Sequence, residues 1–151
     1  MLSVMRIGDA NSFVEFVFKE AVPEGAQGAS DTCCSVEVSC NGFAGKVKSV
    51  WFARPDIDRF LFDLQNFEVV RKGSVSLDNM SSLSDDSPLS FEIFSVGSLG
   101  HLAVRTALRR ITYVEELSPL TVSISFPLDP GMLRQALEEF RSLFACPPGR
   151  I

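Results

Sequence analysis

Residues 35–52 decide the predicted fold, and they read SVEVSCNGFAGKVKSVWF. Apolar and polar side chains alternate from Ser35 to Cys40, and in Lys46 to Phe52 Val47 and Trp51 are expected on one face with the two lysines opposite. Such a period of two is typical of strands with one buried face. Between the two segments, Asn41-Gly42 favours the positive φ angles of a tight turn. The stretch therefore predicts a β-hairpin.

Strand patterns also occur on both sides of this hairpin. For Leu102 to Arg110 a helix is an alternative, because Ala, Leu and Arg favour helices, but the following Ile111 to Val114 is rich in β-formers. Turns are expected at Ser81–Pro88 and Gly97–Gly100, which are polar or glycine-rich. The predicted strands are Phe13–Lys19, Ser74–Met80, Leu89–Ile93, His101–Tyr113 and Thr121–Phe126.

Two segments show the apolar spacing of helices. The first begins near Pro55, since proline suits the first helical position, and ends at Lys72-Gly73. Asp129 can cap the second, which Pro130 opens and the prolines from Pro147 onward stop. Their apolar stripes are predicted to be Ile57, Phe60, Leu61, Leu64 and Phe67 in the first helix and Met132/Leu133, Leu137, Phe140 and Phe144 in the second.

The predicted order is three strands, a helix, about four strands and a helix. Because successive strands are joined by turns, the pattern favours an α+β fold with a mainly antiparallel, curved sheet of about six to seven strands. One helix is central in the sequence and the other C-terminal, and a sandwich-like arrangement is an alternative. Residues 1–151 are expected to form a single domain, with no internal repeat.

Composition indicates a globular protein without a nucleic-acid or membrane partner. The 151 residues carry a net charge of −5, which argues against binding to polyanions or to an anionic membrane surface. Most of the 13 phenylalanines are expected in the core. The four cysteines contain no Cys-x-x-Cys pair, and the first eleven residues lack a signal-peptide pattern. A reducing cytoplasm is therefore expected.

Acidic residues gather in two stretches that contain no Lys or Arg, one between Lys19 and Lys46 and one between Lys72 and Arg105. Solvated loops are one interpretation. The other is an acidic face that meets a basic protein partner. The candidate partner-binding residues are Glu20, Glu24, Asp31, Asp78, Asp85, Asp86 and Glu92.

Catalytic, metal-binding and cofactor-binding motifs are not recognisable. His101 is the single histidine, so a multi-histidine metal site is excluded, and the cysteine spacing does not match a zinc site. No glycine-rich phosphate loop is present. We predict no cofactor and no enzymatic activity. A Cys–His pair at His101 remains the alternative for an enzyme, and self-association of a phenylalanine-rich structural protein is another.

Several segments together resemble a known family. They are Asn41–Gly45 with Trp51, Asp56–Leu64, Gly100–Leu108 and Phe126–Leu133. The pattern is similar to small bacterial proteins grouped with the WapI-like immunity proteins and neighbouring uncharacterised families, from about Cys40 to Phe144. The resemblance implies a cytoplasmic inhibitor that neutralises a toxin made by the same cell, such as a basic toxin domain. It transfers no inhibitory residue, because the matching positions are mostly core and turn residues.

Overall fold

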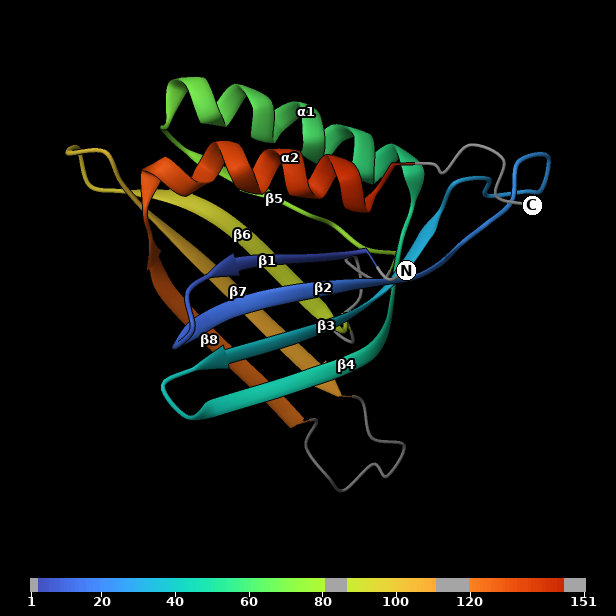
Figure 1. Cartoon of the computed structure of the whole chain (residues 1–151), viewed down its shortest axis with the longest axis horizontal. Coiled ribbons are helices and arrows are strands. Elements are labelled where there is room, and N and C mark those ends of the chain that lie inside the picture. Colours follow the sequence, from blue (N-terminus) through green and yellow to red (C-terminus); the bar gives the residue numbers. More distant parts are fainter. Residues whose placement is uncertain (1–2, 81–86, 111–119, 146–151) are drawn as a thin grey trace.

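The computed structural model describes residues 3–80, 87–110 and 120–145. Its first sheet contains four antiparallel strands in sequence order, and its second sheet contains the next four (Figure 1). The strands of the first sheet are β1 (Val4–Gly8), β2 (Ser12–Ala21), β3 (Thr32–Cys40) and β4 (Phe43–Phe52). The strands of the second are β5 (Ser74–Ser76), β6 (Leu89–Val96), β7 (His101–Arg110) and β8 (Leu120–Leu128). Helix α1 spans Arg54–Val70, and α2 spans Leu133–Leu143 after a 3-10 turn at Pro130–Met132.

The α+β class, the antiparallel pairing and the two helices are confirmed, but the single curved sheet is wrong. The described residues contain eight strands in two separate four-stranded sheets. The reason is α1, which carries the chain away from β4, so that β5 pairs with β6 instead. The pattern also missed β1, a short strand with only Met5 and Ile7 facing inward.

The segment with two competing interpretations, Leu102–Arg110, is a strand and not a helix. The register pairs it with β6 on one side and β8 on the other, so it lies in the middle of its sheet. The remainder of the predicted strand, residues 111–113, lies outside the described residues. Of the predicted strand Ser74–Met80, only Ser74–Ser76 forms a strand.

The two sheets face each other, and the helices cover the opening between them (Figure 1). Helix α2 packs against β1, α1 packs against β5, and the two helices contact each other. One edge strand of each sheet, β1 in the first and β5 in the second, is thus covered by a helix, which protects that edge from pairing with other chains. At the opposite margin β4 contacts β7 and β8 across the interface. None of the helices in the described ranges is long and apolar enough to cross a membrane.

The chain repeats one arrangement twice, which the sequence did not reveal. Residues 4–70 form four strands and a helix, and residues 74–143 form the same succession. The contacts repeat as well: α1 packs on the first strand of the second half, and α2 packs on the first strand of the first half. Likewise β3 contacts β8 where β4 contacts β7. The two halves are therefore equivalent in topology, and their helices are exchanged.

A cluster of phenylalanine rings joins the layers. The Phe140 ring of α2 lies 5.4 Å from Phe16 in the first sheet and 5.8 Å from Phe91 in the second, measured between ring centroids. It lies 4.9 Å from Phe60 of α1 in an edge-to-face arrangement, a geometry that the quadrupoles of aromatic rings favour. All four side chains are buried, so this cluster is the centre of the core.

Arg54 ties the ends of both helices to the β2–β3 connection. Its Nη2 donates to the carbonyl oxygen of Phe144 at 2.8 Å, which satisfies a group left over at the end of α2. Its Nε donates to the carbonyl oxygen of Ser30 at 3.2 Å. One side chain thus fixes the place where α1 begins and α2 ends.

Replacing Phe140 by alanine should lower the free energy of unfolding by about 3–5 kcal/mol, because the change opens a cavity between the two helices and the two sheets. The matched control is Phe62→Ala on α1, whose side chain is 65% exposed. That change should stay within about 0.5 kcal/mol. Denaturant unfolding followed by circular dichroism measures both. Equal effects of the two variants would contradict the central place of Phe140.

Candidate protein-binding surface

Asp31 stabilises the start of α1. Its Oδ1 accepts a hydrogen bond from the backbone N–H of Arg54 at 2.9 Å. The N-cap residue Ala53 has no side chain that could do this, so Asp31 supplies the cap from a distant part of the chain. Its position is set by the preceding turn, in which a Cβ on Gly28 would lie 2.6 Å from Asp31 Oδ2. This carboxylate therefore has a structural partner.

Asp78 and Glu92 are also engaged within the molecule. Asp78 pairs with Arg59 at 3.0 Å, and Glu92 pairs with Arg105. The Arg105 guanidinium in addition lies over the ring of Phe94, with its Cζ 4.5 Å from the centroid. Both carboxylates line one cavity of about 240 Å³ together with Arg105. Their negative charge is thus largely matched by arginine.

The other candidate acids lie elsewhere. Glu20 is at the end of β2 and Glu24 is in the connection to β3. Both are exposed, and neither forms an ion pair with any residue that the structure describes. Asp85 and Asp86 lie outside the described residues. The described candidate acids therefore lie on β2, on β6 and in the connections that follow β2 and β5.

His101 is exposed at the start of β7. It lines a cavity of about 390 Å³ whose other walls come from β6, β7 and β8 and include Phe94, Phe126 and Pro127. The residues lining that cavity include no Cys, Asp or Glu. The pair that the enzyme alternative requires is therefore not formed there.

The cysteines within the described ranges are free thiols in or beside the core. Cys33 and Cys34 are buried on opposite faces of β3, and Cys40 is half-buried. Burial raises the pKa of the Cys34 thiol to about 12, so it stays protonated at neutral pH. Across residues 3–80, 87–110 and 120–145, no group of three His, Cys, Asp or Glu side chains could hold a metal ion.

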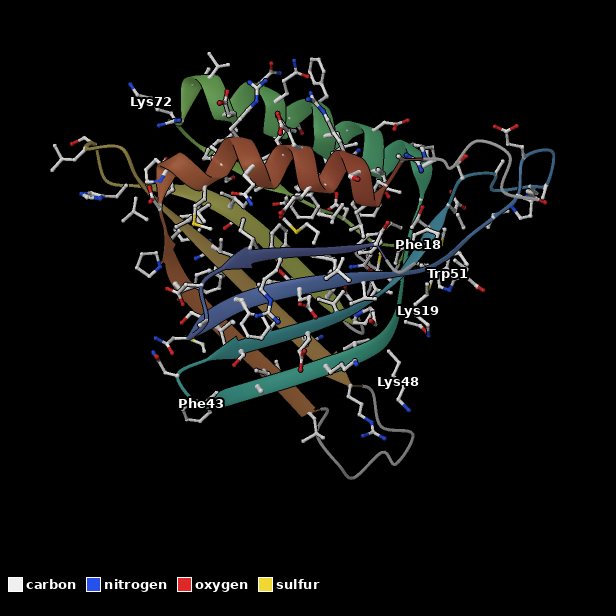
Figure 2. The ribbon with its side chains drawn as sticks, viewed as in Figure 1. Phe18, Lys19, Phe43, Lys48, Trp51 and Lys72 are labelled. Atoms are coloured by element: carbon white, nitrogen blue, oxygen red, sulfur yellow. The ribbon has the colours of Figure 1, made fainter. Side chains whose placement is uncertain are left out.

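A groove opens where the β3–β4 turn overhangs β8. It encloses about 500 Å³. Phe43, at the beginning of β4, is 74% exposed at its entrance (Figure 2). Its walls come from the β3–β4 hairpin and from β8. They are Cys40, Asn41, Phe43 and Ala44 of the hairpin and Thr121–Ser125 of β8.

This groove lies beside the core, beyond the point where the two sheets pack against each other. Alternation along β4 puts Phe43 on the same side as Gly45 and Val47, which face the second sheet. At Gly45 the sheets touch, because an added Cβ would lie 3.0 Å from a methyl group of Val122. Past Gly45 the space widens into the groove, so Phe43 extends over it without being buried. An exposed aromatic ring beside apolar walls and hydroxyl groups is typical of a binding surface.

The margin of β4 is basic. Every ion pair among the described residues has an arginine as its cation, so the four lysines are left without one. Three of them, Lys19, Lys46 and Lys48, lie on β2 and β4 of the first sheet. Figure 2 shows Lys19 and Lys48 near Trp51, at the end of β4 opposite Phe43.

Two β-bulges shape this basic margin. In β2 the register shifts between Phe18 and Glu20, which leaves Lys19 as the extra residue. In β4 the register shifts opposite Ser35, where Lys48 and Ser49 occupy the place of one residue. The Lys19 ammonium donates to the carbonyl oxygen of Lys48 at 3.1 Å and to Ser49 Oγ at 3.2 Å. Bulges re-aim side chains and often flank functional sites.

Sequence reasoning missed this surface for two reasons. Phe43 falls between the two predicted strands of the hairpin, although its spacing from Val47 places it on the inward side of β4. The bulges leave no pattern in the sequence, because they depend on how three strands pair.

In comparisons with known proteins, no family model matches the chain, and no curated protein matches it.

Asp31→Ala should lower the free energy of unfolding by about 1 kcal/mol, the usual effect of losing a helix cap. Glu24→Ala is the control, since Glu24 is an exposed acid in the same connection without an ion pair to a described residue. Its effect should stay within about 0.5 kcal/mol. Urea denaturation of both variants decides. An unchanged free energy of unfolding in Asp31→Ala would contradict the capping role of Asp31.

Proposed function

We propose that this protein is a non-enzymatic protein-binding domain that inhibits its partner by covering it, in the manner of an immunity protein. The observation that supports the proposal best is Phe43, 74% exposed at the entrance of a groove of about 500 Å³. Binding energy in protein interfaces comes mostly from a few aromatic anchors surrounded by polar groups. Phe43 has that position, with Thr121, Ser123 and Ser125 nearby.

Long-range electrostatics supports a partner that carries positive charge. The net charge is −5, and Glu20 and Glu24 are exposed acids without an ion pair among the described residues. Such charges raise the association rate with a basic partner, for example a toxin domain that attacks nucleic acid. Electrostatic attraction would bring the partner to the surface of this protein, where it then contacts the groove.

The free thiols agree with a cytoplasmic setting. Cys33 and Cys34 are adjacent in β3 and are not joined to any described cysteine. Reduced cysteines of this kind are usual where glutathione and thioredoxin keep thiols reduced. We therefore propose the cytoplasm as the place where the protein acts.

Co-purification with the products of neighbouring genes should identify a partner, and Phe43→Ser should weaken that complex by about tenfold or more, as expected for an aromatic anchor. Phe62→Ser on α1 is the matched control, because Phe62 is 65% exposed and far along the chain from the groove. Its complex should keep its affinity within about twofold. Isothermal calorimetry gives both constants. Failure of every neighbouring product to bind would count against the proposed function.

Glu20→Lys together with Glu24→Lys should slow association with a basic partner and flatten its dependence on ionic strength, since surface charges act mainly on the association rate. Dissociation should change little. Stopped-flow measurements between low and physiological salt separate the two rates. Unchanged association kinetics would remove these acids from the proposed surface.

A further inference from the structure

Strand β4 presents backbone groups that no described strand pairs with. It is the last strand of the first sheet. The two-residue turn Asn41-Gly42 makes Cys40 and Phe43 a pair that exchanges hydrogen bonds, so bonding to β3 recurs at every second residue. The N–H and C=O groups of Ala44 and Lys46 therefore point away from β3, toward the open edge.

The open part of this edge has a defined length. At its far end the carbonyl oxygen of Trp51 accepts the backbone N–H of Met80 at 3.0 Å, so the edge is closed there. From Phe43 to Lys48, about 17 Å at about 3.4 Å per residue, no described strand or loop pairs with the outward backbone groups of this edge. This span is the length of a strand of five or six residues.

The two sides of the open edge differ in chemistry. On the side that faces the second sheet lie Phe43 and the apolar residues Val122 and Ile124 of the groove. On the outer side lie Lys46 and Lys48, both exposed. Lys46 is opposite Glu37 in the register but forms no ion pair with a described residue.

We propose that the edge of β4 binds an extended segment of the partner in which apolar and acidic residues alternate, a locally acidic stretch of a protein whose net charge is positive. The segment pairs with Ala44 and Lys46 as a fifth strand of the first sheet, so its side chains point alternately to the two sides. The apolar ones enter the groove beside Phe43, and the acidic ones lie beside Lys46 and Lys48. The inference rests on the proposed function and specifies which kind of partner segment the protein recognises.

Charge selects this occupant over a second copy of the chain. Pairing of two β4 edges would bring Lys46 and Lys48 of both copies together, and like charges across adjacent strands are destabilising. Lysines on an edge strand are a known protection against such pairing. An acidic segment meets the same lysines favourably, because its carboxylates supply the partners that they lack.

Fluorescence anisotropy with short labelled peptides tests the proposal on the full-length protein. The probe is a fluorescein-labelled peptide of alternating valine and glutamate, seven residues long. We expect it to bind at least tenfold more tightly than the alternating valine–lysine peptide and than a peptide of the same composition with its glutamates grouped at one end. Equal binding of the grouped peptide would show that charge alone acts, and would overturn the proposal.

Two protein variants separate pairing from charge. Lys46→Glu with Lys48→Glu should reverse the preference, so that the valine–lysine peptide binds more tightly. Ala44→Pro should abolish binding of both, because proline removes an N–H from the open edge, where it disturbs no bond to β3. If that variant does not fold, N-methylation of alternate amides in the peptide provides the same test, since one of the two methylated patterns must lose binding. Retained binding with both patterns overturns the proposal.

The identified partner distinguishes this inference from the proposed function. Loss of the complex in Phe43→Ser and in Lys46→Glu with Lys48→Glu supports both. Loss only in Phe43→Ser leaves the proposed function standing and overturns edge pairing. Light scattering completes the test: concentration-dependent dimers that Ala44→Pro abolishes, without any peptide binding, would assign the edge to a second copy and overturn the proposal.

Discussion

The contact of Phe140 with Phe16 and Phe91 holds the structure together, because within the described residues the two sheets share no hydrogen-bonded ladder. Strands within a sheet are joined by backbone bonds, whereas the sheets are joined by packing. Packing energy is proportional to the apolar area removed from water, and a phenylalanine contributes much area without a polar group to satisfy. This explains why a chain with a single tryptophan and a single tyrosine carries so many phenylalanines. The helices are needed for the same reason, since α2 brings Phe140 to both sheets.

Much of the local structure could be predicted from the sequence. The stripe of Phe60, Leu64 and Phe67 is buried, as is that of Leu137, Phe140 and Phe144. The Asn41-Gly42 turn and the alternation before it were also correct, and Asp129 accepts a capping bond from the Gly131 N–H at 2.9 Å. These features depend on residues a few positions apart, so periodicity and turn chemistry determine them. The split into two sheets depends on which distant strands meet, and alternation alone does not specify that.

The candidate site was harder to predict for a related reason. In the sequence no base lies near the candidate acids, yet in the fold Asp78 forms an ion pair with Arg59 and Glu92 forms one with Arg105. Asp31 likewise finds the start of α1, 23 positions away. The surface that emerged instead depends on a groove between β4 and β8 and on two bulges, all of which arise from tertiary contacts. The sequence shows which charges are neighbours along the chain, whereas binding depends on which charges the fold brings close together.

The exchange of helices between the two halves has a consequence for how the fold is assembled. Neither half is complete alone, since the first strand of each is covered by the helix of the other. The short connection at residues 71–73 therefore acts as a tether, which turns what would be the association of two molecules into an intramolecular step at high effective concentration. It also places most decisive contacts far apart in sequence, a property of slow-folding topologies. The described chain thus has the topology of two similar units joined in one polypeptide, with their helices exchanged.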